Sequence, residues 1–373
     1  MLSNQPHDEI AINEDRSFRA YHTFVRHLGL HSHGPLTEDT WRAYNRAIDA
    51  AGVTPATDKE TYPFLDELPE YQLWSWFNRI DRQRKYNTPD YGVVAAVRAQ
   101  EKELAPKLDA IAAEGIKSGR LKLNPDLKMP AYFTQVDFHQ HPEGVWQHPL
   151  DGLSYDLARR TTNPAHSDPN DVYRMIFSHL PDGAKTDRVL DWGTGHGAGV
   201  LTWLEGHPNS EVHGVDIAAP CVKYAYAMAK DRGGNAFWSQ QDLEHLDYPD
   251  NHFDVAFFCF MLHEIPPGPT KALFKEVLRV LKPDGVFLGM EIGRTANPFQ
   301  AALQDQNCWL NNEPFMIACA DADYPALMKK AGFSSAEAGE YAFRHPPKGT
   351  MGPKEDDKAA VPKTRHNIYV ARK

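Results

Sequence analysis

Residues 189–197 read Val-Leu-Asp-Trp-Gly-Thr-Gly-His-Gly, and this stretch decides the fold that the sequence predicts. An apolar strand runs into a glycine-rich turn, and a helix is expected from Ala198 onward. Glycines lack the side chains that would keep a ligand away from backbone amides at the start of a helix. The stretch therefore predicts a strand, a nucleotide-binding turn and a helix, in that order.

Outward from this turn, short apolar strands alternate with helices, as in a doubly wound α/β fold. Strands are expected at 188–192, 211–216, 236–240, 253–260, 286–291, 334–342 and 367–371. Helices are expected at 198–205, 220–231, 270–281 and 324–331, and a Pro- and Lys-rich surface loop at 345–363. Residues 151–373 are thus predicted to form a Rossmann-like, seven-stranded sheet with helices on both faces.

Residues 1–150 are expected to form a mainly helical accessory domain that acts as a lid or a dimer contact. Apolar residues recur at helical spacing in 36–51, where Gly52 should end the helix, and again in 71–80. Thr88 followed by Pro89 predicts the start of another helix, which Gly115 should close. Residues 121–156 lose this periodicity and predict a connector rich in Pro, Gly, His and aromatic side chains.

Composition limits the classes of function. The 373 residues suffice for two domains, and a net charge of −10 with a pI near 6.0 argues against nucleic acid as a partner. The polar, acidic first residues and the lack of a long apolar run predict a soluble, cytoplasmic protein with no membrane segment. Four cysteines without CxxC spacing are expected to be reduced thiols.

Three carboxylates follow strands in the order that a nucleotide site requires. Asp191 stands directly before the glycine turn, where it could meet a cationic amine, and Asp216 ends the second strand, where it could bind both ribose hydroxyls. Asp242 follows the third strand with Leu243, suited to an adenine amino group and ring. Dinucleotide enzymes favour GxGxxG, whereas this turn is GxGxG, which favours S-adenosylmethionine over NAD.

The run from Val189 to Gly293 resembles class I S-adenosylmethionine-dependent methyltransferases, the broad group that includes quinone-biosynthesis and small-molecule methyltransferases. The resemblance rests on residues 191–197, Asp216, Asp242, Phe-Asp-Val at 253–255 and Glu-Val-Leu-Arg-Val-Leu-Lys-Pro-Asp-Gly at 276–285. It implies S-adenosylmethionine as the cofactor, with the glycine turn on its methionine portion. The expected cofactor-binding residues are Asp191, Gly193, Gly195, Gly197, Asp216, Ile217, Asp242, Leu243 and Tyr155.

The fourth strand ends Phe-Met-Leu-His-Glu-Ile-Pro at 260–266. It lacks the Asn/Asp-Pro-Pro-aromatic segment of enzymes that methylate amide or base nitrogens, which disfavours DNA and protein-glutamine substrates. His263 is a candidate general base for O-methylation of a small organic acceptor, with Glu264 orienting it or binding the substrate. His263 could instead cap the next helix or pack structurally, and a sulfur, nitrogen or carbon acceptor stays open.

Further side chains are candidates for the acceptor pocket: His139, His141 and Trp146 in the connector, Glu291 after the fifth strand, and Asn312 in the segment 311–316. His139 and His141 could chelate a metal with His263 or Glu264, but hydrogen-bonded histidines are commoner than ligands, so no metal is predicted. Two rivals remain, a non-catalytic S-adenosylmethionine-binding subunit and a nicotinamide oxidoreductase. A homodimer is also compatible with the sequence.

Overall fold

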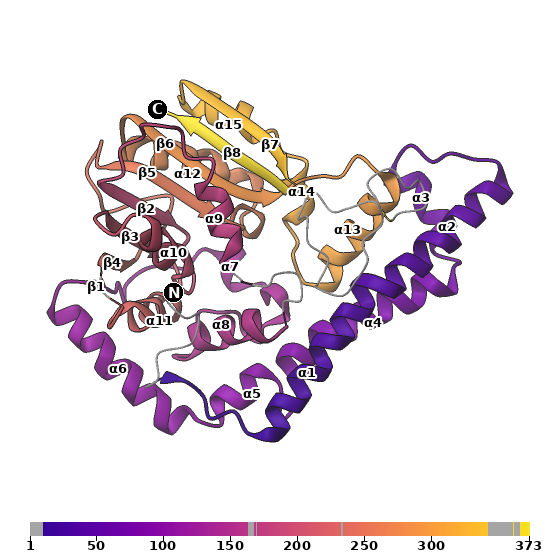
Figure 1. Ribbon diagram of the computed structural model, residues 1–373, viewed down its shortest axis with the longest axis horizontal. Helices are drawn as coiled ribbons and strands as arrows, with labels where there is room; N and C mark the ends of the chain where they lie inside the picture. Colours follow the sequence, from indigo (N-terminus) through magenta and orange to yellow (C-terminus); the bar gives the residue numbers. More distant parts are fainter. Residues whose placement is uncertain (1–9, 163–167, 169, 233, 342–360, 362–365) are drawn as a thin grey trace.

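A central sheet of eight strands organises the protein, whose computed structural model describes residues 10–162, 168, 170–232, 234–341, 361 and 366–373 (Figure 1). The strand order is β1-β4-β3-β2-β5-β6-β8-β7, parallel except for β8, which runs antiparallel to both of its neighbours. The strands are β1 Leu121–Lys122, β2 Arg188–Trp192, β3 Glu211–Asp216, β4 Asn235–Gln240, β5 Phe253–Cys259, β6 Leu281–Ile292, β7 Ser335–Tyr341 and β8 His366–Arg372.

All seven predicted strands are present, which confirms the α/β fold class. The eighth strand, β1, comes from the connector and pairs with the outer edge of β4. Two residues carry no measurable periodicity, so the sequence could not predict it. The 345–363 loop lies outside the described residues except for Val361.

Helices cover both faces of the sheet, because consecutive residues of β2 enter different hydrophobic clusters. Val189 packs with residues of α10 and α11, whereas Leu190 packs with residues of α12 and α15. The helices of this part are α8 Asp151–Thr162, α9 Asp171–Phe177, α10 Ala198–Gly206, α11 Ala219–Ala229, α12 Pro267–Val280, α13 Pro298–Leu310, α14 Met316–Ala320 and α15 Tyr324–Ala331.

Residues 16–117 are mainly helical, as expected. Their elements are α1 Arg16–His31, a π-helical turn Ser32–Leu36, α2 Thr37–Ala51, α3 Asp58–Leu65, α4 Pro69–Asn87, α5 Val93–Arg98 and α6 Glu101–Lys117. Figure 1 shows α1 and α4 as long neighbouring helices. No helix among the described residues is both long and apolar enough to cross a membrane.

Gly52 ends α2 in the left-handed conformation, as expected, but two other predicted helix boundaries are wrong. Thr88 follows the last residue of α4 instead of starting a helix, because α4 continues to Asn87 and the next helix begins only at Val93. Gly115 lies inside α6 and does not end it. A β-carbon at Gly115 would come within 2.6 Å of the Tyr226 ring, so close packing explains this glycine.

The helical half packs directly against the hydrophobic core of the sheet half. Val93, Val97 and Leu104 share a cluster with sheet residues, while Leu36, Leu65 and Trp74 pack with Phe299 and Leu303 of α13. The packing is continuous across residue 150, and the division into domains 1–150 and 151–373 stays a prediction.

A substitution at Leu303 measures how much the packing of α13 against the N-terminal helices stabilises the protein. This side chain is 4% exposed, and Leu303→Ala is expected to lower the free energy of unfolding by about 2 to 3 kcal/mol through lost burial and a cavity. Leu73→Ala is the matched control, because Leu73 on α4 is 45% exposed and its loss should cost less than about 0.5 kcal/mol. Urea denaturation measures both, and equal effects would contradict the packing described here.

Candidate active site

The glycine turn between β2 and α10 presents its backbone to a cavity. Gly193, Gly195 and Gly197 have φ angles of 84°, 53° and 88°, a region that glycine adopts without strain. A β-carbon at Gly195 would meet nothing closer than the Tyr155 ring, at 3.7 Å. The turn is therefore open on the side that faces Tyr155.

Asp216, the last residue of β3, is the carboxylate held against this turn. Its Oδ2 accepts a hydrogen bond from the Gly195 amide at 2.8 Å, and its Oδ1 accepts one from Ala218 at 3.0 Å. Burial raises the pKa of Asp216 to about 6, although these backbone hydrogen bonds oppose the rise. The carboxylate is thus fixed in place at the carboxyl ends of the strands.

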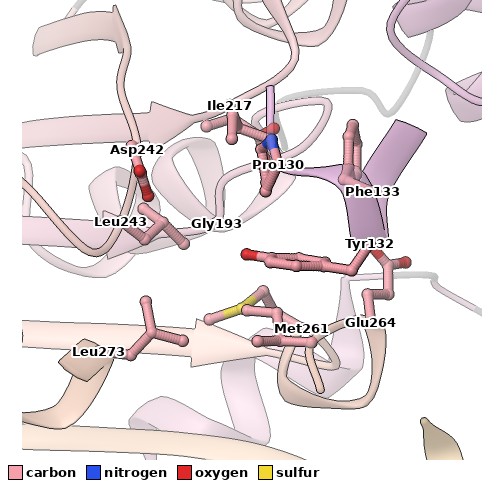
Figure 2. A pocket seen from close by; sticks show the side chains of 12 residues that line it. Pro130, Tyr132, Phe133, Gly193, Ile217, Asp242, Leu243, Met261, Glu264 and Leu273 are labelled. Atoms are coloured by element: carbon pink, nitrogen blue, oxygen red, sulfur yellow. The ribbon is translucent and has the colours of Figure 1, made fainter. Parts of the chain in front are cut away.

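Two adjoining cavities surround Asp216. The first, about 490 Å³, is lined by Asp216, Ile217, Asp242 and Leu243 and by Pro130, Tyr132 and Phe133 of the connector. Figure 2 shows Tyr132, from helix α7 (Ala131–Thr134), extending between Leu243 and Met261. The connector therefore forms one wall of this cavity.

The second cavity, about 700 Å³, shares Phe133, Gly193, Asp216, Met261 and Glu264 with the first. Its other walls are mainly aromatic and polar and include Phe138, His139, Tyr155, Tyr173, His196 and Phe260. The two cavities therefore adjoin, with Asp216 and Glu264 at the junction.

His263 lies behind this junction and lines neither cavity. Its Nδ1 is 2.7 Å from Oε1 of Glu291, and Glu291 is fully buried at the end of β6. Burial alone would lower the pKa of His263, but the charge of Glu291 outweighs it and raises this pKa to about 10. Glu291 therefore holds the imidazole in place and favours its protonated form.

His139 connects the cavity wall to a second buried carboxylate. Its Nε2 is 3.2 Å from Oε1 of Glu264, and its Nδ1 is 2.8 Å from Oε1 of Glu313. Burial would lower the pKa of His139, but these two carboxylates raise it. Asn311 also contacts Nδ1 of His139, and Arg82 of α4 donates to Asn311 at 2.8 Å. The helical half thus helps to hold the site.

Several predicted cofactor residues lie together, and two do not reach the cavities. Gly193, Gly195, Asp216, Ile217, Asp242, Leu243 and Tyr155 line one cavity or both. Asp191 is buried and accepts a hydrogen bond from Thr194 at 2.7 Å, so its carboxylate supports the turn from below. Gly197 starts α10 and packs against Trp238 and Ala225.

Of the predicted acceptor-side residues, only His139 and Glu264 line the second cavity. His141 is fully buried with its ring against Tyr86, and Trp146 packs in a separate hydrophobic cluster. Asn312 donates to the Asp137 carbonyl at 3.2 Å and so ties down the connector. His139 and Gln140 have φ angles of 55° and 58°, so the segment turns and His139 and His141 do not share a strand face.

Sequence reasoning missed several residues of the site. Tyr132, Phe133 and Met261 line the first cavity, and Glu313 holds His139. The connector had drawn attention by its aromatic content, and Glu313 lies in the segment 311–316 that was linked to the acceptor pocket. Local pattern indicated these segments but gave no means to choose among their side chains.

Known proteins share the sequence of the glycine turn and of the strands around it. The sequence profile of a family described as "Methyltransferase domain" matches residues 189–285. Residues 189–285 form a class I S-adenosylmethionine-dependent methyltransferase domain. The predicted family and cofactor class are thereby confirmed for this domain. The match ends at residue 285, within β6.

Curated relatives share the methyltransferase domain. The chain is 36% identical over 142 residues to the ubiquinone/menaquinone biosynthesis C-methyltransferase UbiE of Bdellovibrio bacteriovorus, which covers 36% of this chain and 60% of that protein. It is 30% identical over 173 residues to the probable methyltransferase ltbC of Aspergillus luteorubrus, covering 42% and 60%. The chain therefore spans about 60% of the length of these two relatives.

Solved structures give a weaker likeness. The phosphoethanolamine N-methyltransferase 2 of Haemonchus contortus, in complex with S-adenosyl-L-methionine, has a TM-score of 0.38 and 19% identity, covering 54% of this chain and 52% of that one. A likeness of this degree adds nothing to the assignment of the methyltransferase domain.

Proposed function

We propose that this protein transfers a methyl group from S-adenosylmethionine to the oxygen of a small organic acceptor. The observation that carries the proposal is that two cavities adjoin at Asp216, since Gly193, Asp216 and Glu264 line both of them. This arrangement would bring a cofactor on the glycine turn close to an acceptor in the second cavity.

The residues of the first cavity fit this cofactor. In this proposal Asp216 binds the ribose hydroxyls, Asp242 and Leu243 bind adenine, and the open backbone at Gly195 with Tyr155, in the adjoining second cavity, binds the methionine portion. When bound, S-adenosylmethionine supplies an electrophilic methyl group on a sulfonium. The aromatic walls of Tyr155, Tyr173 and Phe133 suit a cation and exclude water.

The acceptor end combines aromatic walls with His139 and Glu264. The cofactor would occupy part of the second cavity's space of about 700 Å³, which includes the part open to solvent. Phe138 and Phe260 favour an aromatic or largely apolar acceptor, and the two polar groups favour one with a hydroxyl. We therefore propose a phenol or a related hydroxylated ring as the acceptor class.

Proton removal from the acceptor hydroxyl needs a group at the cavity surface. His263, expected from sequence to be the general base, is the weaker choice because it lines neither cavity and Glu291 keeps it cationic. Glu264 lines both cavities and its carboxylate contacts His139. We propose that Glu264 faces the acceptor and that His263 holds this part of the wall in position.

Carbon is the second candidate for the acceptor atom. The relatives from Bdellovibrio bacteriovorus and several pseudomonads are named C-methyltransferases of ubiquinone and menaquinone biosynthesis. Loss of a phenolic proton makes both the oxygen and the neighbouring ring carbons nucleophilic, so the same residues would serve either outcome. The non-catalytic S-adenosylmethionine-binding subunit stays as a rival, whereas the family match disfavours a nicotinamide oxidoreductase.

A labelled-methyl assay tests the proposal. The protein is incubated with methyl-labelled S-adenosylmethionine and a panel of phenols, hydroxy acids, amines and thioethers, and S-adenosylhomocysteine and products are quantified. Acceptor-dependent S-adenosylhomocysteine that Glu264→Gln reduces would support the proposal, and product NMR separates O-methyl from C-methyl. Cofactor binding without turnover on any acceptor would favour the non-catalytic rival, and a preference for NAD would overturn the proposal.

The pKa of Asp216 predicts a pH dependence of cofactor binding. A carboxylate accepts hydrogen bonds from both ribose hydroxyls, whereas its protonated form loses acceptor capacity. Because this pKa is raised to about 6, affinity should be nearly constant above pH 7 and fall by about tenfold from pH 7 to pH 5. Calorimetric titration between pH 5 and 8 measures it. Asp216→Asn should bind weakly at every pH, and a wild-type affinity that rises on acidification contradicts the assignment.

Three further expectations stay predictions: the protein is cytoplasmic, it forms a homodimer, and it has no nucleic-acid partner. Exposed Trp309 on α13 and Trp76 on α4 are compatible with a subunit contact, with 81% and 57% of their surfaces exposed. Light scattering of the purified protein measures the oligomeric state.

A further inference from the structure

Three potential metal ligands meet at the edge of the second cavity. His139 comes from the connector, and His263 and Glu264 follow β5, yet one ligand atom of each lies within 4.8 Å of the other two. His139 and Glu264 line the cavity, while His263 lies behind them. We propose that these three side chains bind one divalent transition-metal ion, with a remaining coordination position that faces the acceptor.

The outer contacts of both histidines support this site. Nδ1 of His263 contacts the buried Glu291 at 2.7 Å, and Nδ1 of His139 contacts the buried Glu313 at 2.8 Å. Metal-binding histidines almost always donate their second nitrogen to a carboxylate or carbonyl in this manner, which fixes the ring orientation. Both Nε2 atoms are thereby left as the ligand atoms.

The Nε2 atom of each ring is suitably placed for an ion. Among the described residues Nε2 of His263 has no hydrogen-bond partner, and Nε2 of His139 contacts only Glu264, at 3.2 Å. Ligand atoms about 2.0 to 2.2 Å from one ion lie about 3 to 3.5 Å apart. The 3.2 Å between Nε2 of His139 and Oε1 of Glu264 fits this spacing. The Glu264 side chain is 23% exposed and can shift, so that its carboxylate and Nε2 of His263 bind the same ion.

Charge also favours a cation at this point. Glu264, Glu291 and Glu313 surround only two imidazoles, and Glu291 and Glu313 are buried. Metal binding releases the imidazole protons, and a divalent ion would then replace their positive charge beside the three carboxylates. Arg82, which donates to Asn311 near Glu313, offsets part of this negative charge.

The donor set selects the class of ion. Two histidines and one carboxylate with an open position suit Zn²⁺, Fe²⁺, Mn²⁺ or Co²⁺, whereas Mg²⁺ and Ca²⁺ prefer oxygen ligands. The sequence had suggested a chelate of His139 and His141, but His141 is buried against Tyr86. His263 takes the place of His141, because the connector turns at His139 and Gln140.

The role of the ion rests on the proposed function, but its binding does not. An ion in this wall would lower the pKa of an acceptor hydroxyl, so that Glu264 would act as a ligand instead of as the base. Metal binding and cofactor binding can therefore be measured separately.

Titration of the metal-stripped protein with Zn²⁺ and with Co²⁺ tests the inference, by calorimetry and by the visible absorption of bound Co²⁺. One site of micromolar or tighter affinity is expected, with no comparable binding of Mg²⁺. His139→Ala and Glu264→Ala should each weaken it by about 100-fold or more, and Glu313→Gln by about 10- to 100-fold. Thermal melting checks that each variant is folded.

A second group of possible ligands needs a matched control. Glu211, His213 and His252 also lie within 4.8 Å of one another, at the opposite ends of the strands from the cavities. His213→Ala should leave the tight site unchanged. Tight binding that survives His139→Ala and Glu264→Ala, or that His213→Ala removes, would overturn the inference.

Cofactor titration of the same samples separates this inference from the proposed function. Methyl transfer with no metal binding would leave the function in place and refute the metal site. Metal binding that needs His139, without any binding of S-adenosylmethionine, would do the reverse.

Discussion

Replacing Asp216 by alanine is expected to weaken the binding of S-adenosylmethionine by about 100-fold or more. Two charge-assisted hydrogen bonds to ribose hydroxyls, each contributing about 1.5 kcal/mol or more, account for this loss. The variant also removes the acceptor for the Gly195 amide, at 2.8 Å, so the glycine turn loses a support. Calorimetric titration with S-adenosylmethionine and S-adenosylhomocysteine measures the effect.

Two matched aspartates serve as controls for Asp216. Asp242→Ala should weaken binding by about tenfold, because Asp242 lines only the first cavity and one neutral adenine amine is its expected partner. Asp250→Ala should leave binding unchanged, since the Asp250 side chain is 69% exposed and pairs with Arg279. A folded Asp216→Ala protein with wild-type affinity would refute the cofactor site.

Replacing Glu291 by alanine is expected to lower the free energy of unfolding by about 3 to 5 kcal/mol. Glu291 is fully buried and accepts hydrogen bonds from Nδ1 of His263 at 2.7 Å and from the Ile292 amide at 2.8 Å. Its removal leaves an imidazolium without a counter-charge in a low-dielectric interior, and breaking one partner of a buried pair costs about this much. Urea denaturation of the metal-stripped protein measures it.

Two further variants define what Glu291 contributes. Glu291→Gln keeps an acceptor for His263 and should lose less stability than alanine does, which isolates the part played by charge. Glu337→Ala removes an exposed glutamate of β7 and should change stability by less than about 0.5 kcal/mol. A loss below about 1 kcal/mol for Glu291→Ala would mean that His263 is neutral in the folded protein.

The sequence predicted those features that short-range patterns determine. Strand β2 and the glycine turn follow from an apolar run before spaced glycines, and Asp216 follows from its place at the end of a strand. Gly52 was identified as a helix end because only glycine adopts its φ of 65° at little cost. The seven predicted strands were correct because short apolar runs between turn residues are also local patterns.

Other features depend on tertiary contacts that no local pattern reports. The pairing of His263 with Glu291 joins residues 28 apart, and that of His139 with Glu313 joins residues 174 apart, so neither was predictable from spacing. The left-handed φ of His139 sends its side chain away from His141, although an alternating pattern would place both on one face. The two-residue strand β1 forms only because β4 offers an edge.

The anchoring of the connector has a consequence for the catalytic cycle. This segment is joined to the sheet edge through β1 at one end, and at the other Asn312 and Glu313 hold Asp137 and His139. Tyr132, between these anchors, fills part of the first cavity (Figure 2). On the proposed function, a cover anchored at both ends would slow the departure of spent cofactor, which is expected to be slower than methyl transfer itself. Rapid-mixing experiments should then show a burst of product equal to one turnover, followed by a slower steady rate.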